Sequence, residues 1–184
     1  LVDFADAIVG HITGGLGHVN ILASMFFGGI SGSAIADTAA IGGLLIPPMI
    51  EQDYPADYSA AITASSAVIG IIIPPSIPFI LYGIITSTSI ARLFLAGIIP
   101  GIIVGLALML TTYFTTKKHG YGHIVESEQV AEFTLGRLWK TFKRAWLALT
   151  IPVLVVGGIL GGIFTATEAG VVAAFVALLL GLFA

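Results

Sequence analysis

Two short stretches of this sequence combine hydroxyl side chains with residues that interrupt helices, inside otherwise apolar chain. Residues 28–33 read GGISGS, and residues 73–78 read IPPSIP. Glycine permits backbone conformations that end a helix, and proline supplies no N–H to continue one. A helix that ends in such a stretch exposes carbonyls that attract a cation, and a helix that begins there exposes N–H groups that attract an anion. The two stretches therefore predict one site for a small cation and for the anionic group of a substrate.

The candidate ligands divide into two sets. The predicted sodium ligands are carbonyl and hydroxyl oxygens at or before the interruptions, from Phe27, Gly28, Gly29, Ser31, Gly32, Gly70 and Ile73. The predicted substrate contacts are N–H groups and capping hydroxyls at the helix starts, from Ser33, Ala34, Ser76 and Ile77. Sodium is expected as a coupling ion, and we predict no other metal, no cofactor and no catalytic residue.

Asp37 is the acid that lies well inside the first apolar segment. As an ionised group it would repel an anionic substrate, so we expect no direct substrate contact. Two roles stay open for it. One is a structural role, in which the carboxylate complements the dipole of the helix that follows Ser33, and the other is a role in holding a cation.

Ser31 also permits a different interpretation. The sequence GISG around it fits the G-x-S-G pattern of rhomboid intramembrane proteases, in which Ser31 would be the nucleophile. That chemistry requires a base within hydrogen-bond reach of the serine. The four histidines lie outside the cores of the later apolar segments, at His11, His18, His119 and His123. We therefore prefer the ion and substrate site over the protease.

The composition indicates whether this chain folds in water or in a membrane. Charged residues make up 9% of the 184 residues and hydrophobic residues 57%, and the mean hydropathy is +1.06. Soluble domains carry about 25% charged residues, so this chain cannot cover a water-exposed surface, and we predict an integral membrane protein. The absence of cysteine excludes disulfides and thiolate metal sites. The chain begins without Met and ends in an apolar run, so we expect a fragment of a longer transporter or channel chain.

The elements that must position the candidate ligands follow from the apolar pattern. Residues 19–50 are predicted to form a re-entrant helical hairpin with its tip at GGISGS, because about ten apolar residues rise only about 15 Å, half of the hydrocarbon core. The alternative is one long helix whose small residues allow close packing. Residues 59–91 are predicted to be a crossing broken over 72–78 by its prolines. Continuous spans are expected at 98–116, 147–164 and 168–184, with Glu168 capping the last of them.

Residues 117–146 form the one long polar stretch and hold six of the seven basic residues. The positive-inside rule therefore places this loop in the cytoplasm. Within it, apolar and basic residues alternate with helical spacing from Leu135 to Trp146, which predicts an amphipathic helix. Attachment to the inner membrane surface and packing on protein both fit this helix.

Several motifs carry a family resemblance. The stretches GGISGSAIADTAAIGGLLIPPMI, IGIIIPPSIPFILYG, TSIARLFLAGIIPG and GGIFTATEAG resemble the large membrane subunit of TRAP transporters, the DctM family. The match runs in order over most of the chain. One departure is Ala166, where the family often has a proline.

The resemblance implies an all-α transporter fold made of inverted repeats, rather than an enzyme. Residues 1–116 would be most of the first repeat and residues 147–184 the start of the second. It further implies sodium-coupled import of organic acids by an elevator mechanism, across the inner membrane of a bacterium or archaeon. The implied partners are a small membrane subunit of the DctQ type, a periplasmic substrate-binding protein and the lipid bilayer, with no role for nucleic acid.

Overall fold

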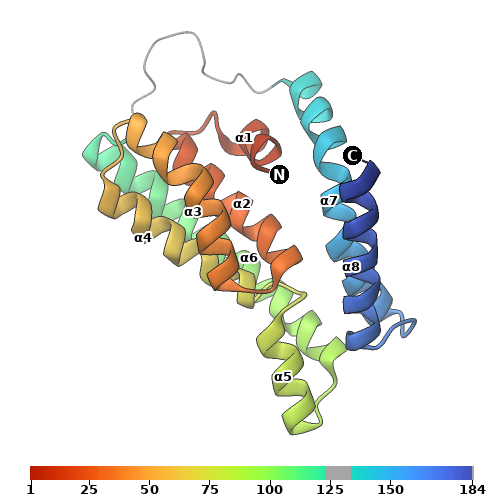
Figure 1. Cartoon of the computed structure of the whole chain (residues 1–184). Coiled ribbons are helices and arrows are strands. Elements are labelled where there is room, and N and C mark those ends of the chain that lie inside the picture. Colours follow the sequence, from red (N-terminus) through yellow and green to blue (C-terminus); the bar gives the residue numbers. More distant parts are fainter. Residues whose placement is uncertain (123–133, 184) are drawn as a thin grey trace.

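The computed structural model describes residues 1–122 and 134–183, and within these residues the protein is helical, without strands. The helices are α1 (Val2–Val9), α2 (Gly15–Ser31), α3 (Ala34–Glu51), α4 (Ala56–Ala67), the 3-10 helix η1 (Val68–Ile71), α5 (Ile77–Thr86), α6 (Ile90–His119), α7 (Leu135–Leu160) and α8 (Ala166–Phe183). Helices α2, α3 and α4 pack against one another, α6 packs along α2, and α7 and α8 form a neighbouring pair (Figure 1). Three of the described helices, α3, α6 and α7, are long and apolar enough to cross a bilayer. Together with the composition, this makes the chain an integral membrane protein.

The GGISGS stretch breaks the chain into two packed helices, so the alternative of one long helix is wrong. α2 ends at Ser31, and Gly32 follows with a φ of 61°, a left-handed conformation that favours glycine. Ser33 is the N-cap of α3, as predicted, and its Oγ accepts a hydrogen bond from Ala36 N at 3.4 Å. The first arm is longer than expected: α2 has 17 residues and rises about 25 Å. Arm length therefore gives no support for a hairpin of half depth.

The second interruption also lies where the prolines predict it. α4 tightens into η1, the chain leaves helical geometry at residues 72–76, and α5 begins at Ile77. Ser76 caps α5, and its Oγ accepts a hydrogen bond from Phe79 N at 3.3 Å. The predicted break over 72–78 was two residues too long, because Pro78 lies in the first turn of α5, where a missing N–H costs nothing.

The boundaries of α5 and α6 differ from the expected ones. α5 ends at Thr86 with Ser87 in a left-handed conformation, so the second half of the broken crossing stops before residue 91. Ser89 then caps α6, which continues through Pro100 to His119, well beyond the predicted span 98–116. A serine cap and apolar chain on both sides of Pro100 make one 30-residue helix here.

The predicted amphipathic helix and the predicted span 147–164 are one continuous helix, α7, because no glycine or proline separates residues 137–151. This corrects the boundary placed at residue 146. The middle of the polar loop, residues 123–133, lies outside the described residues, and His123 with it. α8 begins at Ala166, and Thr165 and Glu168 form the expected cap: Thr165 N donates to Glu168 Oε2 at 2.8 Å, and Glu168 N donates to Thr165 Oγ1 at 3.3 Å.

Candidate ion and substrate site

The tip of the α2–α3 hairpin lies directly against the α4–α5 break. A Cβ added to Gly28 would lie 2.4 Å from Gly70 Cα, so the two backbones touch at a point where neither side has room for a side chain. At the tip itself, Ile77 N donates a long hydrogen bond of 3.4 Å to the Gly32 carbonyl. A Cβ on Gly32 would lie 2.7 Å from the Pro75 carbonyl. The prediction that the two interruptions face each other is therefore confirmed as geometry.

Helix α6 holds the break in place through a row of glycines that the sequence reasoning did not single out. A Cβ on Gly97 would lie 2.3 Å from the Ile72 carbonyl, and one on Gly101 would lie 2.4 Å from Ile73 Cγ1. One turn further, a Cβ on Gly105 would lie 2.6 Å from Met25 Sδ of α2. The spacing of four residues between these glycines is the signal that would have found this face.

The proline break leaves carbonyls of the predicted sodium set without their helical donors. Pro74 has no N–H, so the Gly70 carbonyl loses its i+4 partner. The Ile73 carbonyl loses its i+4 partner as well, because Ile77 N donates to Gly32 instead. The Ile71 carbonyl, which faces the same loss at Pro75, accepts the Ser76 hydroxyl at 2.7 Å. The break thus supplies carbonyl oxygens at Gly70 and Ile73, two positions that the sequence analysis named.

The predicted sodium ligands on α2, the first arm of the hairpin, lie in different surroundings. Gly29 lies near the break and near α7, since a Cβ there would be 3.7 Å from the Pro74 carbonyl and 3.6 Å from Pro152 Cβ. The side chain of Phe27 packs against the apolar core between α1, α2 and α3. Ser31 Oγ donates to the Ser33 carbonyl at 3.4 Å and accepts from Ser33 N at 3.3 Å, so it closes the tip.

The four predicted substrate contacts are also brought together, but their N–H groups differ. The Ala34 N–H has no acceptor among the described residues, which is the ordinary state of a first helical turn that can bind an anion. The Ile77 N–H is paired with Gly32, so in this structure it stabilises the tip. Ser33 and Ser76 serve as the helix caps. Any substrate contact by Ile77 N–H would require this bond to open.

Asp37 is fully buried beside this junction. Neither of its carboxylate oxygens has a hydrogen-bond partner among the described residues. A Cβ on Gly70 would lie 3.9 Å from Asp37 Oδ2 and 4.0 Å from the Ser33 carbonyl, so the acid borders the predicted sodium set. The Ser24 hydroxyl lies near the carboxylate, yet its hydrogen bond is to Ser66 Oγ at 3.0 Å. A buried carboxylate without partners is unfavourable unless a proton or a cation neutralises it.

A buried polar ladder connects α2 to α4 behind Asp37, and the sequence reasoning missed it. Asn20 Nδ2 donates to Thr63 Oγ1 at 2.8 Å, and Ser66 Oγ donates to Asn20 Oδ1 at 3.2 Å. Its members are fully or almost fully buried. Thr63 and Ser66 lie one turn apart on α4, and Asn20 and Ser24 one turn apart on α2, so helical spacing of polar residues within apolar chain was the available signal.

The protease interpretation finds no support in this geometry. No described hydrogen bond joins Ser31 to a histidine. His18 lies in α2 with Nε2 3.1 Å from the Thr13 carbonyl, and His119 Nδ1 lies 3.1 Å from the Thr115 carbonyl at the end of α6. Among the residues that the structure describes, Ser31 is therefore not paired with the base that a nucleophile needs.

Comparison with known proteins agrees with the architecture around the two interruptions. The model of the family described as "Tripartite ATP-independent periplasmic transporter, DctM component" matches residues 1–184. This chain belongs to the DctM family. The family resemblance of the motifs is thus confirmed, and the family is one of transporter components rather than of enzymes.

Individual relatives show how much of a DctM protein is present. The chain is 46% identical over 181 residues to the sialic acid TRAP transporter large permease SiaM of Vibrio cholerae, covering 98% of this chain and 41% of SiaM. It is 43% identical over 178 residues to the 2,3-diketo-L-gulonate TRAP transporter large permease YiaN of Escherichia coli, covering 97% and 40%. It is 45% identical over 183 residues to the isethionate TRAP transporter permease DctMQ of Oleidesulfovibrio alaskensis, covering 100% and 28%. The chain thus spans about two fifths or less of the length of these relatives.

Proposed function

We propose that this chain is part of the large permease subunit of a sodium-coupled TRAP-type transporter that imports an organic acid. The observation that carries the proposal is the contact between the two interruptions, where Gly28 meets Gly70 and Ile77 N donates to the Gly32 carbonyl. Interrupted helices that meet inside a membrane protein are the usual setting of a secondary-transporter binding site. The named substrates of the relatives, sialic acid, 2,3-diketo-L-gulonate and isethionate, support an organic acid.

The sodium ion would lie between the tip and the break. The carbonyls of Gly70 and Ile73 lack helical donors, and Gly70 touches Gly28 near the C-terminal end of α2. Two sets of helix C-terminal carbonyls repel each other unless a cation lies between them. Asp37 borders this place and has no hydrogen-bond partner within residues 1–122 and 134–183, which favours the ion role left open above.

The substrate would bind on the opposite side of the two interruptions, at the helix starts. The Ala34 N–H is available there, and Ser33 and Ser76 hold the two helix starts in position. An ion that fixes the tip also fixes the direction of these N–H groups. Sodium binding would then strengthen substrate binding, and by linkage the substrate would strengthen sodium binding by the same factor.

The remaining parts of the proposal come from the family. The hairpin would be re-entrant, the chain would hold most of one inverted repeat and the start of the second, and import would proceed by an elevator motion. The partners would be a small DctQ-type membrane subunit and a periplasmic substrate-binding protein, in a bacterial or archaeal inner membrane. Residues 117–146 would be cytoplasmic.

Uptake in proteoliposomes tests the site. The complete permease, with its partner proteins, is expected to take up substrate with sodium outside and to lose uptake when potassium or choline replaces sodium. Ser31→Ala and Ser33→Ala should weaken the apparent sodium affinity, whereas the exposed Ser65→Ala serves as a matched control. Uptake that is undiminished without sodium, or an unchanged sodium dependence in both tip variants, contradicts the proposed site.

The proposed topology has its own test. A cysteine introduced at Lys118, near the end of α6, should resist a membrane-impermeant thiol reagent added outside intact cells. The same cysteine should react after the cells are permeabilised. Ready labelling in intact cells would reverse the proposed orientation of the chain in the membrane.

A further inference from the structure

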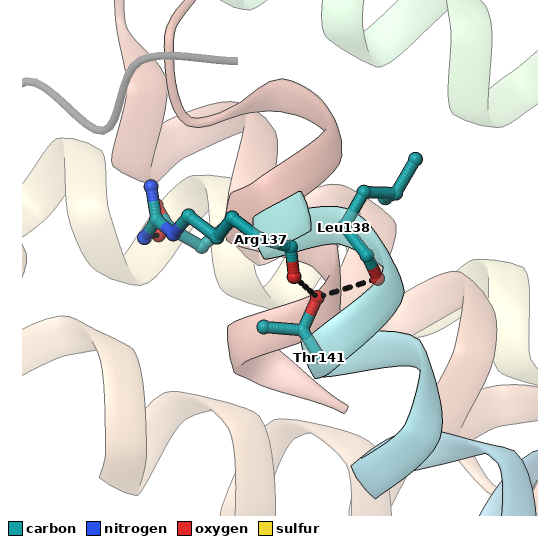
Figure 2. A network of polar contacts seen from close by, with 4 residues as sticks. Arg137, Leu138 and Thr141 are labelled. Carbon is teal, nitrogen blue, oxygen red and sulfur yellow. Dashed lines mark hydrogen bonds and ion pairs between the residues drawn. The ribbon is translucent and has the colours of Figure 1, made fainter. Parts of the chain in front are cut away.

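The first half of α7 carries four basic residues, and the helix contains no acid of its own. α7 has 26 residues, none of them Asp or Glu, and four basic residues. Arg137 is paired with Asp6 of α1, the one salt bridge among the described residues. Its side chain extends away from that of Leu138, and Thr141 Oγ1 donates to the carbonyls of Arg137 and Leu138 at 2.9 and 3.1 Å, which secures this turn (Figure 2). The other three basic residues have no acidic partner in the described part of the chain.

These three residues, Lys140, Lys143 and Arg144, are exposed and close together. Residues three or four positions apart on a helix have Cβ atoms about 5–6 Å apart, and like charges at this spacing destabilise the helix. An anion that contacts all three removes this repulsion. A phosphodiester offers acceptor oxygens for charge-assisted hydrogen bonds with ammonium and guanidinium groups.

Aromatic residues beside the basic group indicate the depth at which it lies. Trp139 is 60% exposed and Trp146 47% exposed, and Lys143 Nζ lies 5.4 Å from the centre of the Trp139 ring. Exposed tryptophans next to lysine and arginine are typical of the membrane–water interface. The exposed apolar face continues along the helix to Val153 and Leu160, as expected of a surface in contact with lipid tails.

The continuity of α7 fixes the height of the basic group. Residues 145–160 rise about 24 Å, close to the thickness of a hydrocarbon core. With residues 145–160 in the hydrocarbon core, Trp146 would lie near its edge, and Arg144 and Lys143 would lie about 3–5 Å further out along the axis. That is the depth of the lipid headgroups.

We propose that Lys140, Lys143 and Arg144, with the Trp139 ring as a platform, form a binding site for the headgroup of an anionic phospholipid. The charge of the site is complementary to the anionic lipids of a cytoplasmic leaflet. The site rests on the proposed cytoplasmic position of residues 117–146 but not on transport itself, so lipid binding and uptake are separate measurements.

Native mass spectrometry of the complete permease in detergent tests the site. The protein is mixed with equal amounts of phosphatidylglycerol and phosphatidylcholine that carry the same acyl chains, and the retained lipids are counted. One basic side chain near an anionic surface favours binding by roughly fivefold, so the Lys140→Gln/Lys143→Gln/Arg144→Gln variant should lose phosphatidylglycerol preference by on the order of 100-fold. The charge-preserving Lys140→Arg/Lys143→Arg variant should keep most of the preference, which separates lost binding from misfolding.

Two controls make the result decisive. Lys117→Gln/Lys118→Gln removes positive charge at the end of α6 and should leave the preference nearly unchanged. Equal loss in this control and in the triple variant would show nonspecific attraction and overturn the site. Replacing Glu126, Glu128 and Glu132 of the polar loop with Gln should also leave the preference unchanged. A large gain there would show that these acids occupy the basic group in place of a lipid, which also overturns the proposal.

Discussion

Two regions of this membrane protein place polar groups in different ways. One is the junction between the hairpin tip (residues 28–33) and the α4–α5 break (residues 72–76), and the other is the first half of α7. At the junction, polarity comes from the backbone itself, because two interruptions expose carbonyls and N–H groups in a place where glycines let the chains touch. On α7 the backbone is uninterrupted, and the polarity lies in basic side chains that extend from its surface.

The difference has a physical reason. Freed backbone groups are tolerated at membrane depth only where they are buried in protein or line a water-filled cavity, so the junction must lie between packed helices. Charged side chains at the membrane surface remain in contact with water and headgroups, so α7 needs no such enclosure. Substitutions that add one methyl group should therefore be severe at the junction and mild elsewhere, and the loss of one charge on α7 should have a small effect on folding.

The largest effect is expected for Gly28→Ala. The added methyl would lie 2.4 Å from Gly70 Cα, and neither backbone can move without opening the tip. We expect a destabilisation at the upper end of the roughly 1–3 kcal/mol typical of overpacking, with loss of uptake. Gly43→Ala in α3 is the matched control, because nothing lies within 4 Å of its added methyl. Thermal unfolding and uptake measure both variants, and equal behaviour would show that the close contact is not needed.

Gly97→Ala should come next in severity. Its methyl would lie 2.3 Å from the Ile72 carbonyl, so α6 would be pushed away from the break while the tip contact remains. We expect a destabilisation of roughly 1–3 kcal/mol and a weaker apparent sodium affinity. Gly157→Ala on α7 has open space around it and serves as the control. If Gly97→Ala keeps the wild-type sodium affinity, the packing of α6 against the break is not needed for sodium binding.

Ser76→Ala should have an intermediate effect. The substitution removes the cap on α5 and leaves the Ile71 carbonyl without the 2.7 Å hydrogen bond that replaces its helical donor. The loss of one cap and one buried hydrogen bond should destabilise the protein by about 1–2 kcal/mol. Ser65→Ala is the control, because it makes the same chemical change at an exposed position, and thermal unfolding compares the stabilities of the two variants. If both variants unfold alike, the hydroxyl at position 76 does not stabilise the break.

The smallest effect is expected for Arg137→Gln. Its partner Asp6 and its own side chain are 28% and 37% exposed, so water screens the pair and it should contribute less than about 1 kcal/mol. Unfolding of Arg137→Gln should nearly coincide with that of Lys140→Gln, whose side chain has no described acidic partner. A clearly larger loss of stability in Arg137→Gln than in Lys140→Gln would mean that the ion pair is needed to hold α7 against α1.

The position and residue types of the two interruptions were predictable, since local chemistry decides them. Gly32 ends one helix and Ser33 caps the next, and Pro74 and Pro75 supply no N–H at the second break, although α3 continues through Pro47 and Pro48. Element lengths were less predictable. α7 joined two predicted elements because an amphipathic helix and an apolar span differ in composition but not in helical propensity. α6 extended through Pro100 although proline has the lowest helix propensity, so its length followed from its tertiary context and not from local propensity.

The sequence by itself determined the membrane environment, the family motifs, the two helix interruptions and the residue types of the candidate site. Only the tertiary structure decided that Gly28 meets Gly70, that Ile77 N–H is paired with Gly32, and that Asp37 lies beside them without a partner in the described part of the chain. Capping depends on a few neighbours along the chain, so it is readable from the sequence, whereas a proline pair interrupts the helix at Pro74 and Pro75 but not at Pro47 and Pro48. Contacts between segments more than thirty residues apart depend on how whole helices pack, and no local pattern encodes which backbone atoms then come within reach of one another.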